Sequence, residues 1–152
     1  MNDYNIINGN PIAAETPWET INTNQMAMID SLKTARSNQD LQNIGNTGRH
    51  ILQILATEVF DSEKHNNNPE NLELSEGKWK NRLKVYIESV ANANKEIQKI
   101  FAAFVDSALT TADLSNKLTH HLKTHRFIAE SCVISVIAVV NLVTVIEKNE
   151  IL

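Results

Sequence analysis

The 152-residue chain has few cysteine, proline, glycine and aromatic residues, and it has no excess of positive charge. The single cysteine, Cys132, excludes an internal disulfide and, inside an apolar run, indicates a buried thiol in a reducing compartment, the cytoplasm. Only three prolines and four glycines interrupt the chain, so long stretches are free to form helices. A formal charge of -4 excludes a domain-wide basic field for nucleic acid or an anionic membrane.

The polar, asparagine-rich segment 1–20 lacks the basic and apolar regions of a signal peptide and is predicted to be a flexible arm. Residues 21–152 are predicted to form one all-α domain, a bundle of four to five helices around one core. The apolar run Phe127–Ile146 is long enough to cross a membrane, but it contains Glu130, and a central carboxylate costs about 2.5–3.5 kcal/mol on insertion. A buried central or dimer-interface helix is therefore expected, without a membrane partner.

The first two helices are expected in the N-terminal half. Helical spacing of apolar residues predicts one that begins after Asn22 or Asn24 and ends near Ser37. A second is expected from about 40 to 60, with its apolar residues on one face. Its two glycines indicate close helix contact or a kink.

A polar loop, 61–74, separates the two halves of the bundle. Ser75 can cap a third helix that reaches about Leu109, either unbroken or as two helices jointed at 91–94. Its apolar pattern consists of Trp79, Leu83, Tyr86, Ile87 and Val90, followed by Ile97, Ile100, Phe101, Phe104 and Val105.

The densest group of reactive side chains is Asp113–His125, which holds three of the five histidines. A turn or short helix is expected at 110–118. The last helix is expected to start near Thr124, whose hydroxyl can serve as its N-cap, and to reach Glu147 or Lys148. Any catalytic or binding site is expected at the N-terminal end of this last helix.

Two chemistries fit these histidines. His121 and His125 stand one turn apart, and with His50 as a third ligand they would form a site for a divalent transition metal with an open position for water, as in DinB-like metal-binding bundles. A last helix that starts at Thr124 would leave His121 outside it and break this geometry. Without that site, no cofactor is expected.

The second chemistry is metal-independent RNA cleavage, in which a histidine activates the RNA 2′-OH and a cation steadies the phosphate. Asn116 precedes His120 and His121 by four and five residues, and Lys117 precedes His121 by four. The spacing alone is a weak signal, because histidines near a helix start are common.

Three segments of the chain share an order of motifs: Gly48-Arg-His-Ile-Leu-Gln-Ile-Leu-Ala56, then Lys78-Trp-Lys-Asn-Arg-Leu-Lys-Val-Tyr-Ile87, then Thr119-His-His-Leu-Lys-Thr followed by Ala129-Glu-Ser-Cys-Val-Ile134. The chain in this respect resembles one group of HEPN-type proteins from bacterial abortive-infection and toxin systems. In that group a helix reading R-x-x-L-x-x-L-A precedes a variable loop, an N-R-L helix and a histidine shortly before an A-x-x-C-V-I helix.

The resemblance implies an all-α HEPN-like bundle that often dimerises, with a ribonuclease site built from an R-x4-6-H motif at the dimer cleft. His121 matches the motif histidine by its distance to Ala129 and Cys132. No arginine stands where the motif needs one. Asn116 fills the polar position that often follows the arginine, and Lys117 supplies charge one residue too late and without the planar fork of a guanidinium.

A guanidinium could come from elsewhere in the fold. Arg49 and Arg82 are candidates, and Arg82 is expected to be structural. Arg126, in the first turn of the last helix beside an anion-favouring N-terminus, is the better candidate.

The resemblance thus implies a HEPN-like protein of a bacterial or phage defence or toxin system, expected to be a homodimer with RNA and an antidote or sensor protein as further partners. In the active version, an endoribonuclease, His121 acts on the RNA 2′-OH, while Asn116, Lys117 and Arg126 orient and stabilise the phosphate. The alternative is a non-catalytic assembly or partner-binding module that uses the Val/Ile surface of the last helix. The missing arginine and the acidic balance favour this alternative.

Overall fold

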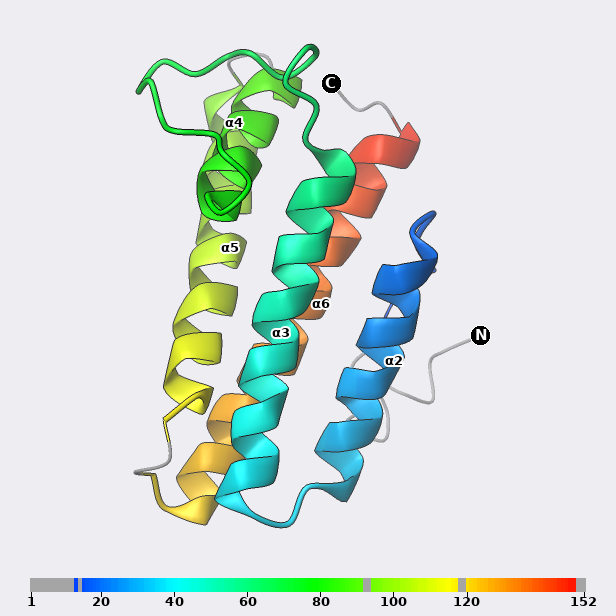
Figure 1. The fold of residues 1–152 in the computed structure, drawn as a ribbon, viewed down its shortest axis with the longest axis vertical. Helices are drawn as coiled ribbons and strands as arrows, with labels where there is room; N and C mark the ends of the chain where they lie inside the picture. Colours follow the sequence, from blue (N-terminus) through cyan, green and yellow to red (C-terminus); the bar gives the residue numbers. More distant parts are fainter. Residues whose placement is uncertain (1–12, 14, 92–93, 118–119, 150–152) are drawn as a thin grey trace.

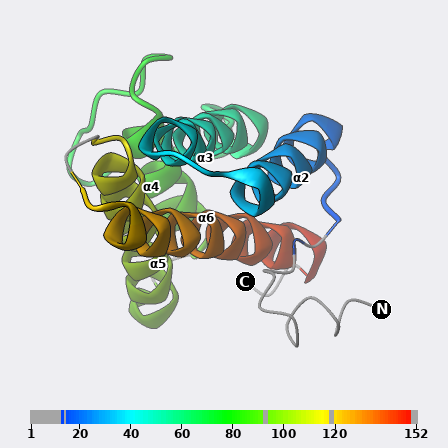
Figure 2. The ribbon, with the colours of Figure 1, turned by 90° about the horizontal axis from the view of Figure 1, so that it is seen from below.

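The computed structural model describes residues 13, 15–91, 94–117 and 120–149, so most of the predicted N-terminal arm lies outside the described residues. The described residues form five helices and no strand, which confirms the all-α prediction. The helices are α2 (Glu19–Thr34), α3 (Asn38–Val59), α4 (Trp79–Val90), α5 (Lys95–Ser115) and α6 (Leu122–Asn149). Along the long axis α2, α3, α5 and α6 alternate in direction, and α6 lies behind α3 (Figure 1). The end view shows α6 crossing below α3 and α2 (Figure 2), and it packs against α2, α3 and α5.

α2 begins at Glu19, earlier than the sequence predicts. The Asn22 side chain does not cap the helix. Its Oδ1 accepts a hydrogen bond from the Thr16 backbone N–H at 2.9 Å, and its Nδ2 donates to the Thr16 carbonyl oxygen at 2.9 Å. These two bonds hold the entering chain against the helix, and Thr16 is buried. The predicted domain boundary at residue 21 therefore falls inside α2.

α3 begins with a capping box, which explains why it starts at Asn38, close to the predicted position. Ser37 Oγ accepts from the Asp40 backbone N–H at 3.2 Å, and Asp40 Oδ2 accepts from the Ser37 N–H at 3.1 Å. The Arg36 N–H also donates to Asp40 Oδ2 at 2.8 Å. Together, the Arg36 and then the Ser37 backbone N–H groups hold the pKa of Asp40 below its usual value.

The two glycines of α3 permit close packing on two sides, which confirms the prediction of close helix contact. A Cβ added to Gly45 would lie 2.9 Å from the Ala112 carbonyl oxygen of α5. A Cβ added to Gly48 would lie 3.0 Å from the Cys132 Sγ of α6. The backbone of α3 therefore sits nearer to both neighbours than a residue with a side chain would allow.

The loop before α4 is longer than predicted. Ser75 does not cap the helix, because its hydroxyl donates to Glu73 Oε1 at 2.9 Å, and α4 begins only at Trp79. The loop is tied to α4 at several points, among them a hydrogen bond of 2.9 Å from Arg82 Nε to the Leu74 carbonyl oxygen.

The two-helix alternative for the next segment is confirmed. α4 ends at Val90, and α5 begins at Lys95 with Asn94 as its N-cap, whose Oδ1 accepts from the Ile97 N–H at 3.2 Å. α5 then continues to Ser115, so the separate turn or short helix predicted at 110–118 is wrong over most of its length.

α6 is the central helix that the sequence predicts. Its fully or nearly buried apolar residues are Ala129, Cys132, Val133, Val136, Ile137, Val139, Val140 and Val143. It is the one helix among the described residues that is long and apolar enough to cross a membrane, with a mean hydropathy of 2.2. Half of that apolar stretch is buried inside the bundle.

Candidate functional site

The described residues of the segment 113–125 lie where α5 ends and α6 begins, at one end of the bundle (Figure 1). α6 starts at Leu122, two residues before Thr124. The His125 N–H donates to the His121 carbonyl oxygen at 2.8 Å, so His121 precedes the first turn. Thr124 lies inside that turn and is exposed, and the prediction that it is the N-cap is wrong.

His125 is a buried connector of three helices, with no exposed surface. Its Nε2 lies 2.6 Å from the Ser115 carbonyl oxygen at the end of α5. Its Nδ1 lies 2.9 Å from Asn38 Oδ1 at the start of α3, and Asn38 Nδ2 donates to the His120 carbonyl oxygen at 3.2 Å. Both ring nitrogens are therefore engaged inside the protein, and neither is available to a metal or a substrate.

His120 and His121 differ in their surroundings. The His120 ring is partly buried, its Nε2 lies 2.9 Å from the Leu114 carbonyl oxygen, and its centroid is 5.3 Å from that of His125. The His121 ring is exposed. Of the three histidines at this corner, His121 is the one whose ring a solvent-borne ligand can reach.

Asn116 and Lys117 lie near His121 in sequence but have separate contacts. Asn116 is the C-cap of α5, and its carbonyl oxygen accepts a hydrogen bond from Gln42 Nε2 at 2.9 Å. Lys117 is exposed and has no ion pair within the part of the chain that the structure describes. The corner thus offers one exposed imidazole and the exposed ammonium groups of Lys117 and Lys123, without a guanidinium between them.

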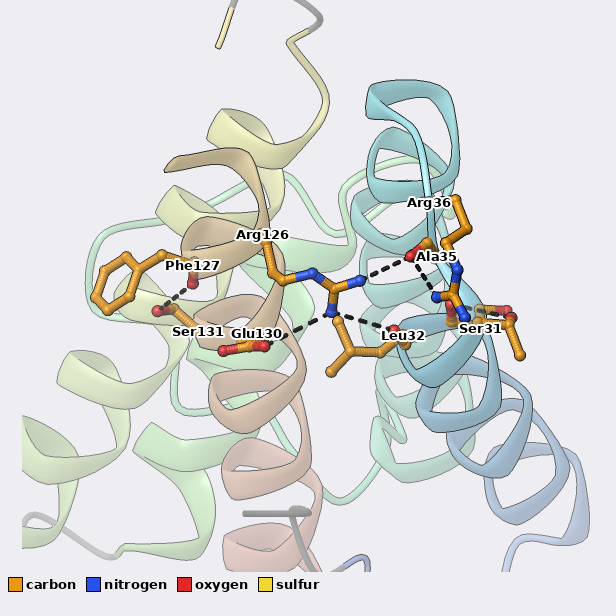
Figure 3. Close-up of polar contacts among 9 residues, drawn as sticks. Ser31, Leu32, Ala35, Arg36, Arg126, Phe127, Glu130 and Ser131 are labelled. Atoms are coloured by element: carbon orange, nitrogen blue, oxygen red, sulfur yellow. Dashed lines mark hydrogen bonds and ion pairs between the residues drawn. The ribbon is translucent and has the colours of Figure 1, made fainter. Parts of the chain in front are cut away.

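Arg126 points away from this corner, to the end of α2 (Figure 3). Its Nη2 donates to the Ala35 carbonyl oxygen at 2.7 Å, and its Nη1 donates to the Leu32 carbonyl oxygen at 3.5 Å. Nη1 also lies 3.7 Å from Glu130 Oε1. The guanidinium therefore caps the negative end of α2, where a cation is favoured, and is committed to that helix rather than to a phosphate beside His121.

The other two candidate arginines are also engaged. Arg49 pairs with Asp113 across α3 and α5. Arg82 is structural, as expected, since it bonds the Leu74 carbonyl oxygen and its guanidinium carbon lies 5.4 Å from the Phe60 ring centroid. Neither one supplies the missing arginine of the R-x4-6-H motif.

The three-histidine metal site is not formed. His50 lies twelve residues along α3 from Asn38, about 18 Å further along the helix at 1.5 Å per residue, whereas His125 contacts Asn38 itself. His50 instead lines a separate cavity beside Trp79. Within the described residues no group of three His, Cys, Asp or Glu side chains could hold a metal ion.

The buried thiol and the cluster at the opposite end of the bundle are structural. Burial raises the pKa of Cys132 to about 11, although the Thr111 hydroxyl opposes the shift, so the thiol is protonated and unreactive. At the other end, the Tyr86 hydroxyl donates to Glu147 Oε2 at 2.7 Å, and burial first, then this bond, raises the pKa of Tyr86. His65 Nδ1 accepts from the Asp61 N–H at 2.9 Å.

Apolar side chains are exposed on the outer surface of α5 and α6, whereas the sequence predicted an interface on the last helix alone. Most valines and isoleucines of the last helix, the expected interface, are buried in the core, but two of them are exposed, together with Phe127 and two apolar side chains of α5. We name them the α5–α6 face; they are Ile100 and Phe104 on α5 and Phe127, Ile134 and Val145 on α6. The sequence could have revealed this face, because α5 and α6 each contain more apolar residues than one buried side of a helix can hold.

No family model, no curated protein and no solved structure matches this chain. The likeness to HEPN-type proteins therefore rests on the three sequence segments alone.

Proposed function

We propose that this chain is a non-catalytic helical module, HEPN-like in kind, that forms a homodimer through the α5–α6 face. The observation that carries the proposal is the exposure of that face. Phe127 is 71% exposed, Ile134 57% and Ile100 53%. The His125 ring is buried, and the Arg126 guanidinium is bonded to the end of α2. Both observations argue against a nuclease centre within one subunit.

The exposed side chains lie on two neighbouring helices. Phe127, Ile134 and Val145 are seven and eleven residues apart, which corresponds to about two and three helical turns and places them on one side of α6. α5 lies antiparallel beside α6, joined by a hydrogen bond of 3.0 Å between the hydroxyl oxygens of Ser107 and Ser135. Phe104, about one turn from Ser107, therefore lies beside the α6 stripe.

The size of this surface fits a small dimer interface. The α6 stripe from Phe127 to Val145 covers eighteen residue steps, roughly 27 Å at 1.5 Å per residue, and two helices about 10 Å across give roughly 20 Å of width. The footprint of the two helices is therefore on the order of 540 Å², and the exposed apolar side chains cover part of it. This footprint is smaller than the roughly 800 Å² that a stable dimer buries on each partner, so the expected dimer is a weak one.

The charge of the face suits a second copy of the chain. Glu130, the carboxylate on this side of α6, is paired with Arg126 of the same chain. Ser107 and Ser131 lie between the apolar residues as small neutral groups. Two copies related by a two-fold axis can therefore meet without burying Glu130 as an unpaired carboxylate.

Sedimentation velocity at micromolar concentrations tests the proposal with three chains: the wild type, Phe127→Asp and Met26→Asp. Met26 is 55% exposed on α2, outside the α5–α6 face, and serves as the matched control. We expect dimers for the wild type and the control, and a folded monomer for Phe127→Asp. A wild type that is monomeric across this range, or a dimer that survives Phe127→Asp, would overturn the proposal.

A metal-independent ribonuclease is the second candidate, favoured by one observation. His121 is exposed at the start of α6, and Lys117 and Lys123, also exposed, flank it. Purified protein with EDTA present should then cleave total RNA or tRNA, and His121→Ala should abolish cleavage while His50→Ala, an exposed histidine elsewhere, should not. No cleavage by a folded wild-type dimer rejects this candidate.

A further inference from the structure

A cavity of about 390 Å³ lies between α3 and the start of α4, distant from the α5–α6 face. One wall is a single side of α3 from His50 to Glu58, and the opposite wall consists of Glu76, Gly77 and Trp79. The volume falls within the range of small-molecule sites, roughly 300–1,000 Å³.

The walls combine an apolar surface with negative charge. Trp79 and Ile54 are partly buried and supply the apolar surface. Glu58 and Glu76 supply two carboxylates, and neither is in an ion pair within the described residues. No lysine or arginine is among the described residues that line the cavity.

The backbone adds to this negative potential. Glu58 lies in the last turn of α3, which contains no basic residue. The carbonyl groups at a helix C-terminus favour a cation, so a carboxylate there is electrostatically unfavourable unless a positive charge comes from elsewhere. A cationic ligand beside Glu58 would relieve this repulsion.

The indole of Trp79 is placed to interact with cations. The Lys80 Nζ lies 5.8 Å from the centroid of the ring, inside the distance at which an aromatic face attracts a cation. Lys80 does not line the cavity, whereas Trp79 does, so the ring is shared between this internal contact and the cavity.

We propose that this cavity binds a small organic cation of the alkylammonium or alkylguanidinium class. Its charge lies between Glu58 and Glu76, and its apolar part lies on Trp79 and Ile54. Two carboxylates and one imidazole do not amount to a metal-ion site here, which agrees with the lack of a metal-binding group among the described residues. The proposal is independent of dimer formation.

Nuclear magnetic resonance of the full chain tests this inference, because the chain has two tryptophans and each gives one indole N–H signal. Butylammonium and ethylguanidinium are the probes, and butanol at the same concentration is the neutral control. We expect a saturable shift of the Trp79 signal with both cations and none with butanol, while the Trp18 signal stays in place. Sodium chloride should weaken the binding.

Two variants connect the shift to the cavity. Glu76→Gln should weaken binding by about two- to fivefold, the effect of one exposed charge pair, while Glu63→Gln, a loop carboxylate outside the cavity, should not. Gly77→Leu should keep the fold, because a Cβ at Gly77 meets nothing within 4 Å, and it adds bulk to a residue that lines the cavity. An equal response to butanol, or unchanged binding by Glu76→Gln, would overturn the proposal.

Discussion

Replacement of His125 by alanine separates a structural histidine from a catalytic one. The ring is fully buried, and its Nε2 and Nδ1 lie 2.6 and 2.9 Å from the Ser115 carbonyl oxygen and Asn38 Oδ1. Alanine removes both contacts and leaves these two oxygens without the imidazole. Because the three groups come from α6, α5 and α3, the change loosens the junction of three helices at once.

The magnitude follows mainly from the buried Ser115 carbonyl oxygen, since a neutral imidazole has one N–H to donate and the Asn38 side chain is only partly buried. A buried polar group that loses its partner costs about 1–3 kcal/mol, and the space left by the ring adds a cavity term. Alanine recovers up to about 0.7 kcal/mol through its better helix propensity, and a water molecule that enters the space recovers part of the hydrogen bonding. We expect a net loss of about 3–5 kcal/mol in the free energy of unfolding, a large share of the roughly 5–15 kcal/mol of an ordinary domain.

Urea unfolding followed by far-UV circular dichroism measures this loss. His121→Ala is the matched control, since its ring is exposed four residues away, and its stability should stay within about 0.5 kcal/mol of the wild type. His125→Gln, whose amide can still donate one hydrogen bond, should fall between the two. A loss below about 1 kcal/mol for His125→Ala, or an equal loss for His121→Ala, would refute the reasoning.

Three further changes test other parts of the fold. Gly45→Ala should lower the thermal midpoint of unfolding, because overpacking against the Ala112 carbonyl oxygen costs about 1–3 kcal/mol and outweighs the roughly 1 kcal/mol gained in helix propensity. A midpoint at or above that of the wild type would contradict this. Arg126→Met should cost about 1–2 kcal/mol and speed amide hydrogen exchange in the last turn of α2, and unchanged exchange there would argue against the cap. Burial lowers the pKa of His65 below 6.5 in the folded protein. As the pH falls, the imidazole is therefore protonated in the unfolded chain before it is protonated in the folded one. The contribution of neutral His65 to stability is present above pH 6.5 and is lost as the pH falls through the folded-state pKa. His65→Gln should therefore lose less stability in acid than the wild type. Identical profiles of stability against pH for the two proteins would count against this.

The helices could be predicted from the sequence because their main signal is local. The spacing of apolar residues along α3 places Leu41, Ile44, Ile51 and Leu55 on one face, and all four are buried. Helix ends were less certain, since a polar side chain near a boundary has several possible partners. Asn22 bonds back to Thr16 instead of capping, and no local pattern distinguishes these outcomes.

The candidate site depended on contacts that the sequence does not show. His125 meets Asn38, 87 residues away, and Arg126 meets Ala35, 91 residues away. From the sequence, a histidine near a helix start can be a metal ligand, a general base or a buried residue that joins helices, and only its distant partners distinguish these roles. Ile100 and Phe104 pose the same problem, since an apolar helical residue faces the core or the solvent according to where the neighbouring helices lie.

The central position of α6 also determines when the bundle can be completed during synthesis. α6 leaves the ribosome after α2, α3 and α5, the three helices against which it packs. At about 5–20 residues per second, its 28 residues take roughly one to six seconds to translate. During that interval α2 and α3 can pair as a local hairpin, but the side of α3 that will receive α6 remains open to water. The nascent chain therefore presents an apolar surface to chaperones until its longest helix has emerged.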